Sequence, residues 1–114
     1  MTQHASLSPE RWARFDLPKQ ILQIALELHR GSSALKSGDA PRLQPCLERA
    51  LRLADLTIAV NTGRSLRREL LRLRSAVAEI YVDPAPRAAD VDLALRVLLQ
   101  MHPECTEHVE LLGA

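Results

Sequence analysis

The segment GRSLRRELLRLRSAVAEIYVDPAP, residues 63–86, decides the fold class of this chain. Its apolar side chains recur at alternating spacings of four and three residues, the period of a helix that buries one face. They are Leu66, Leu70, Leu73, Val77 and Ile80. A break at residues 61–63 precedes the stripe, and Pro84 ends it because a proline ring cannot continue the hydrogen-bond ladder. The segment predicts one amphipathic helix.

The rest of the chain carries similar helix starts and stops. Ser8-Pro9-Glu10 predicts a short helix to about residue 14, and Asp16 with Pro18 opens a longer one that reaches residue 35. A further helix is expected over about 43–62, and another carries apolar residues from 91 to 101. Period-two alternation is missing, so the prediction is an all-α, antiparallel up-down four-helix bundle with a short N-terminal helix or arm. We expect the arm over residues 1–15, the bundle over 16–102 and a C-terminal tail over 103–114.

Composition is that of a globular domain. The 114 residues are 46% hydrophobic and 25% charged. No stretch approaches the roughly 20 apolar residues of a membrane span, and no secretory leader is visible. Two cysteines are too few for a disulfide framework. We therefore expect a cytoplasmic protein with reduced thiols and no membrane contact.

Charge is segregated along the chain, although the net charge is only +1. Residues 42–74 hold eight arginines against three acids, and residues 75–114 hold two arginines against seven acids. Arg64, Arg68 and Arg72 share one side of the predicted helix, and Arg67 and Arg74 lie on the other flank of the apolar stripe. Three interpretations stay open: a solvated face paired with acids of the next helix or of a neighbouring subunit, a phosphate-binding surface for nucleic acid, or a site for an acidic protein.

The predicted helix over 43–62 has apolar residues on more than one face. Such a helix is either central in the bundle or pressed against another subunit. The second alternative predicts oligomer-interface candidates on this helix. They are Arg49, Leu51, Arg52 and Ile58.

Catalytic and metal-binding patterns are weak. His102, Cys105 and His108 are spaced three apart, but Pro103 interrupts them and a fourth zinc ligand is not obvious. No Glu-x-x-His pair, phosphate-binding loop or nucleophile elbow occurs. Glu79 is expected to be a boundary residue paired with an arginine. We expect no catalytic residue, no cofactor and no metal site.

Four short segments carry a resemblance to a known family. They are residues 47–50 (LERA), 57–59 (TIA), 63–65 (GRS) and 75–80 (SAVAEI). Together they resemble the bacterial four-helix-bundle proteins that include the ribosomal RNA intervening-sequence proteins and the accessory variability determinant of diversity-generating retroelements. Arg49-Ala50, Ile58-Ala59 and Glu79 stand at positions that match the family pattern, whereas Cys46 and Thr57 replace its Gln and Asn.

The resemblance implies a cytosolic bundle that assembles into a ring of five, and in the retroelement branch a basic surface that binds nucleic acid and reverse transcriptase. The leading hypothesis is therefore a non-enzymatic homo-oligomer, a pentamer, that acts as an interaction or scaffold module. The alternative is a nucleic-acid-binding accessory protein that uses the arginines of residues 64–74.

Overall fold

The computed structural model describes residues 7–108, and every regular element in that range is a helix. The elements are α1 (Pro9–Trp12), α2 (Leu17–Lys36), the 3₁₀ helix η2 (Ala40–Arg42), α3 (Leu43–Val60), α4 (Arg64–Val82), α5 (Ala88–Leu99) and α6 (Pro103–Thr106). The prediction of an all-helical chain is confirmed for these residues. Residues 1–6 of the predicted arm and 109–114 of the predicted tail lie outside the described range.

Local chemistry explains where the first helices start and where α2 ends. The Ser8 hydroxyl oxygen accepts the Arg11 N–H at 3.2 Å, and the Asp16 carboxylate accepts the Lys19 N–H at 3.1 Å. Each bond satisfies an amide that has no partner inside its helix. After α2 the chain turns at Gly38, whose φ of +79° lies in the left-handed region that glycine adopts without strain.

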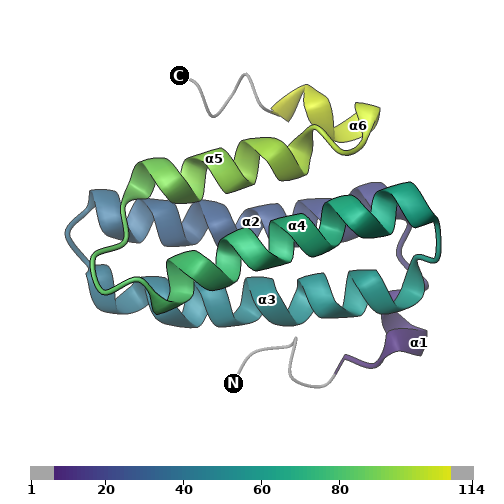
Figure 1. Cartoon of the computed structure of the whole chain (residues 1–114), viewed down its shortest axis with the longest axis horizontal. Helices are drawn as coiled ribbons and strands as arrows, with labels where there is room; N and C mark the ends of the chain where they lie inside the picture. The colour runs from purple at the N-terminus through teal and green to yellow at the C-terminus, as the bar shows by residue number, and fades with distance from the viewer. Residues whose placement is uncertain (1–6, 109–114) are drawn as a thin grey trace.

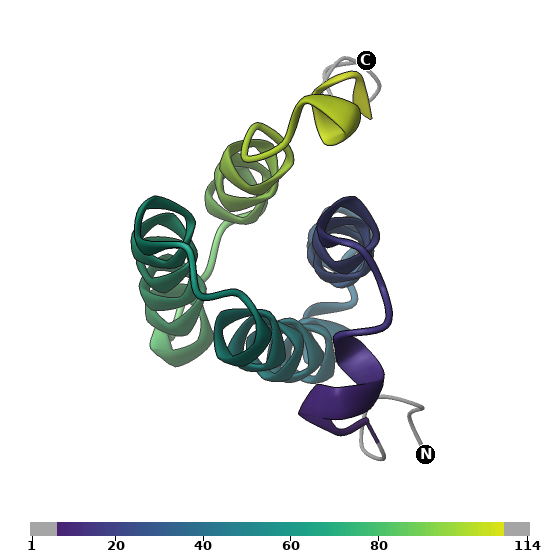
Figure 2. The ribbon, with the colours of Figure 1, turned by 90° about the vertical axis from the view of Figure 1, so that its right-hand side faces the viewer.

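The long helices α2, α3, α4 and α5 lie side by side along the longest dimension of the molecule (Figure 1). Helix α2 packs against α3 and α5, and α4 packs against the same two helices (Figure 2). The Cα radius of gyration is 13.4 Å, as expected for a compact chain of about 100 residues. No helix within residues 7–108 combines the length and apolar character needed to cross a bilayer.

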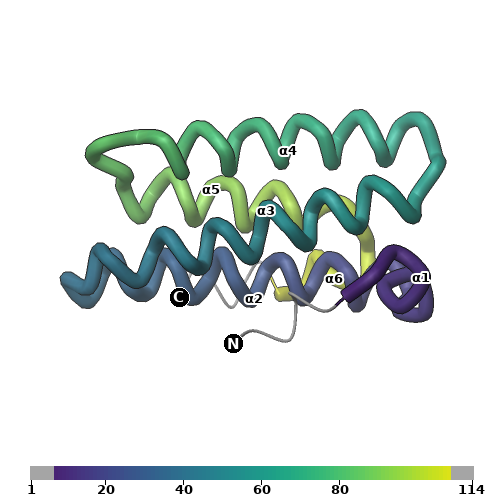
Figure 3. The backbone as a smooth tube through the Cα atoms, turned by 90° about the horizontal axis from the view of Figure 1, so that it is seen from below, coloured from purple at the N-terminus to yellow at the C-terminus, as the bar shows by residue number. Residues whose placement is uncertain are grey.

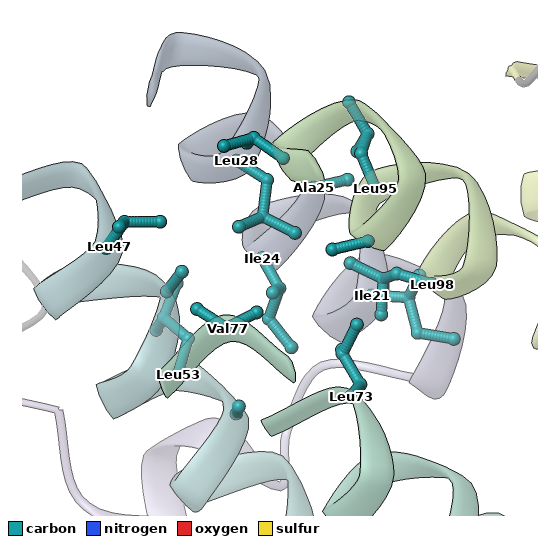
Figure 4. Close-up of a cluster of buried hydrophobic side chains, with 14 of the residues drawn as sticks. Ile21, Ile24, Ala25, Leu28, Leu47, Leu53, Leu73, Val77, Leu95 and Leu98 are labelled. Carbon is teal, nitrogen blue, oxygen red and sulfur yellow. The ribbon is translucent and has the colours of Figure 1, made fainter. Parts of the chain in front are cut away.

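The core lies between these helices, and each of them contributes to it (Figure 4). Ile24 and Leu28 of α2, Leu53 of α3 and Leu95 of α5 are buried in one cluster with three members of the α4 stripe, Leu73, Val77 and Ile80. The first member of that stripe, Leu66, is only partly buried. Fully burying a side chain of this kind contributes roughly 1.5–3 kcal/mol. The predicted apolar faces are therefore the faces that hold the helices together.

Helix α1 packs against α3 at one end of the molecule (Figure 3). The Trp12 ring is buried, and its Nε1 donates to the buried Thr57 Oγ1 at 2.9 Å. Gln20 continues the contact by donating to the Trp12 and Phe15 carbonyls. Helix α3 thus contacts α1, α2 and α4, so part of its two-sided apolar pattern is used inside one chain.

Candidate interaction surface

The arginines predicted from the sequence separate into two groups in the structure. Arg74 is half-buried and donates to both Asp55 carboxylate oxygens of α3, at 2.8 and 3.4 Å, and this bond raises the pKa of Arg74. The remaining arginines of α4 are exposed. They are Arg64, Arg67, Arg68 and Arg72. Arg74 therefore joins α4 to α3, and only the other four are available to a partner.

These exposed arginines are not neutralised by α5. Within residues 7–108 none of Arg64, Arg67, Arg68 and Arg72 makes a salt bridge. The α5 acids face other groups: Asp90 accepts from Arg87, and Asp92 accepts from the Ser32 hydroxyl at 2.5 Å and from the Lys36 ammonium at 2.9 Å. The interpretation in which acids of the next helix neutralise these arginines does not hold for this part of the chain.

An exposed leucine lies among the free arginines. Leu71 is 49% exposed and lines a shallow depression along α4 together with Arg64, Arg67 and Arg68. We call these four residues the basic face. A half-exposed aliphatic side chain surrounded by guanidinium groups can bury apolar area against a partner and bind carboxylates or phosphates at the same time.

A second surface is the groove between α4 and α5, with a volume of about 690 Å³. Its apolar lining includes Leu93 and Val97, which are one helical turn apart and 62% and 44% exposed. Acidic side chains outnumber the single arginine around it. They are Glu69, Glu79, Asp83 and Asp90, against Arg72. We call this surface the acidic groove.

Glu79 was expected to pair with an arginine. Within the described residues it makes no salt bridge, and it borders both the acidic groove and the depression that contains the basic face. Glu69 is likewise exposed on α4 without an ion pair in that range. Both carboxylates are therefore open to a cation supplied from outside the chain.

The interface candidates on α3 lie in several environments. Arg49 is half-buried and donates to Glu27 of α2. Leu51 and Arg52 line a shallow groove between α3 and α4, and Ile58 is half-buried. Of these four residues only Arg52 is fully exposed, and the other three are partly buried.

The buried Glu27–Arg49 pair was not predicted from the sequence. Glu27 is 1% exposed among the buried side chains of α2. The Arg30 guanidinium lies 3.5 Å from its other oxygen. Arg49 Nη2 also lies 3.5 Å from the Cys46 sulfur, and burial raises the pKa of the Cys46 thiol. The sequence signal that could have indicated this ion pair is an acidic residue, Glu27, at a position where α2 buries apolar side chains.

The side chains of His102, Cys105 and His108 are not grouped together in the structure. In the part of the chain that the structure describes, no three His, Cys, Asp or Glu side chains are grouped to hold an ion. His102 Nδ1 accepts the Glu104 N–H, and the buried Cys105 sulfur lies 3.6 Å from the Pro18 carbonyl oxygen. Burial raises the pKa of the Cys105 thiol. The first residues of the predicted tail therefore pack on α2.

No protein family, no curated protein and no solved structure matches the chain. The basic face and the acidic groove are therefore the features of α4 and α5 from which a function can be inferred.

Proposed function

We propose that this chain is a non-enzymatic interaction or scaffold module that assembles from several copies of itself, with five copies as the expected number. We further propose that the packed helices form an antiparallel up-down four-helix bundle of the family that the sequence resembles, acting in the cytoplasm. Short connections between successive long helices support that topology.

One observation carries the proposal of self-association: α4 and α5 expose aliphatic side chains beside opposite charges. Leu71 lies among arginines that make no salt bridge within residues 7–108, and Leu93 and Val97 lie in a groove with Glu69 and Glu79, which make none there either. Adjacent exposed aliphatic residues in a groove are typical of protein interaction sites. Since both surfaces belong to the same chain, a second copy can supply opposite charge and exposed aliphatic side chains to each of them.

Polar residues that bridge neighbouring helices support a structural role over a catalytic one. Asp92 joins α5 to α2 through Ser32 and Lys36, and Gln20 links α1 to α2. Asn61 donates to Gln20 Oε1 at 2.9 Å and so connects the end of α3 to the same cluster. In each case the polar group is used to hold one helix against another.

Light scattering over a range of concentrations tests this function. We expect the wild-type chain at micromolar concentration to have a molar mass several times the 12.7 kDa of one chain. A mass of 12.7 kDa over the whole range would contradict self-association.

The second candidate function is binding of a structured nucleic acid. It is favoured by the exposed arginines of α4, since guanidinium groups bind phosphates well. It predicts binding of an RNA hairpin at low salt that weakens steeply as salt rises and is lost in Arg68→Glu/Arg72→Glu. An Arg11→Glu/Arg14→Glu variant controls for net charge. If the wild-type chain does not bind the hairpin at low salt, this candidate is wrong.

A further inference from the structure

The basic face and the acidic groove are neighbouring surfaces of opposite charge. Arg64, Arg67, Arg68 and Leu71 belong to the first, whereas Leu93 and Val97 lie in the second beside Glu79. Each combines exposed aliphatic area with charges that the described part of the chain leaves unpaired. Each surface can therefore bury the exposed aliphatic side chains of the other and supply the opposite charge to its ionised groups.

The two surfaces cannot meet within one copy. Helix α4 itself forms one wall of the acidic groove, through residues such as Leu73, Ala76 and Ile80. The basic face lies on the same helix, on side chains that do not line the groove. A rigid helix cannot place its outer side into a groove that its inner side bounds, so contact between these surfaces needs a second molecule.

We propose that the basic face of one copy docks into the acidic groove of the next copy, with Leu71 packed against Leu93 and Val97. This inference rests on the proposed self-association and names the surfaces that produce it. The amphipathic outer side of α4 would act as the helix in a helix-in-groove contact. Arg64 and Arg68 would face the acidic side chains along the groove, including Glu69 and Glu79.

The docked surfaces are different patches of the chain, so the contact is heterologous. A heterologous contact uses one face and one groove per copy and leaves one of each free at the ends of any open assembly. The assembly therefore continues until it closes into a ring or grows as a filament. Ring closure leaves no unpaired face or groove, which agrees with the expectation of a closed oligomer.

Charge reversal on each surface tests this contact. Arg64→Glu/Arg68→Glu changes the charge of the basic face by −4, and Glu69→Lys/Glu79→Lys changes the charge of the acidic groove by +4. All four side chains are exposed, and none makes a salt bridge within the described residues, so the fold should persist in both variants. We expect each variant to fall from the wild-type mass to the 12.7 kDa of one chain, with an unchanged helical circular dichroism spectrum.

The decisive variant combines all four substitutions. Reversing both surfaces restores opposite charges across the contact, so the quadruple variant should regain the wild-type mass. Matched controls change net charge equally elsewhere: Arg11→Glu/Arg14→Glu for the basic face, and Glu104→Lys/Glu107→Lys for the groove. Both controls should keep the wild-type mass.

A probe without charge separates packing from electrostatics. Leu93→Ala and Leu71→Ala remove exposed aliphatic area and leave the core intact, because both side chains project from it. We expect each to weaken assembly by at least about tenfold, the equivalent of 1.4 kcal/mol.

The measured masses distinguish an error in the proposed contact from an error in the proposed self-association. An assembled wild type whose mass survives both charge reversals would overturn the contact while self-association stands. A quadruple variant that stays at 12.7 kDa with native helix content would overturn it too. Loss of assembly on reversing the basic face but not the groove would also overturn this contact, because the basic face would then dock on a different surface of the second copy. A monomeric wild type would end both proposals.

Discussion

Arg49 of α3 donates through Nε to Oε1 of Glu27 on α2 at 3.0 Å, and the Glu27 side chain is 1% exposed. A carboxylate at that depth costs several kcal/mol to desolvate and is tolerated when cations and hydrogen bonds satisfy it. Because Arg49 retains partial contact with solvent, the two partners are unequal: loss of the arginine removes the shortest ion pair of a buried carboxylate that still contacts Arg30 at 3.5 Å, whereas loss of the acid leaves a cation that can reach water.

Replacing Arg49 with methionine should therefore destabilise the protein strongly. Methionine keeps the apolar stem but removes the hydrogen bond to Glu27, and breaking such a buried pair costs about 3 kcal/mol. Urea denaturation followed by circular dichroism measures the loss. A cost below about 1 kcal/mol would show that other groups satisfy Glu27 equally well.

Glu27→Gln is the matched control for that pair. The amide is neutral, and the released Arg49 side chain can reach water, so this variant should lose less stability than Arg49→Met does. An equal or larger loss in Glu27→Gln would contradict the inequality between the two partners.

Thr57→Val should loosen α1 before it loosens the long helices. The substitution leaves the buried Trp12 Nε1 without its acceptor, which costs about 1–3 kcal/mol. Trp12 is the only tryptophan, so its emission reports on α1 directly. In Thr57→Val the emission change should occur at lower urea than the loss of helical circular dichroism, and in Thr57→Ser the two changes should coincide. Coincident transitions in Thr57→Val would refute separate docking of α1.

Asp92 should link α5 to α2 in a pH-dependent way. Burial alone raises the pKa of Asp92, but the bonds from Ser32 and Lys36 outweigh it and hold that pKa below its ordinary value of 3.8. A depressed folded-state pKa contributes stability that is present above about pH 4 and is lost as pH falls through the folded value. The stability gap between wild type and Asp92→Asn should thus shrink as pH falls below about 4. A gap that widens in acid would contradict this.

Neither thiol should react in the folded protein. Cys46 and Cys105 are buried, and burial raises the pKa of both thiols, so little thiolate forms near neutral pH. Ellman's reagent at pH 8 should titrate two thiols in urea and almost none in buffer. Rapid modification of Cys105 in buffer would show that α6 leaves α2 readily.

Much of the fold was predictable because the signals are local. The apolar residues of α4 repeat with helical spacing over a few turns, and Ser8 and Asp16 are N-cap residues that predict the starts of α1 and α2. The basic character of α4 is equally visible, because side chains at spacings of three and four share a side of any helix.

Other features depend on contacts between distant residues and have no local signal. Arg74 has the same spacing as its neighbours, yet only the three-dimensional structure brings it to Asp55. Trp12 meets Thr57 across 45 positions, and Cys105 meets Pro18 across 87. The acidic groove likewise combines residues of α4 and α5, so its apolar lining emerges only when those two helices lie together.

Native mass spectrometry of the wild-type protein at micromolar concentration shows directly whether this chain assembles with itself. We expect one closed species of defined copy number, with a mass of five times 12.7 kDa. A spectrum that contains only the 12.7 kDa chain would contradict it.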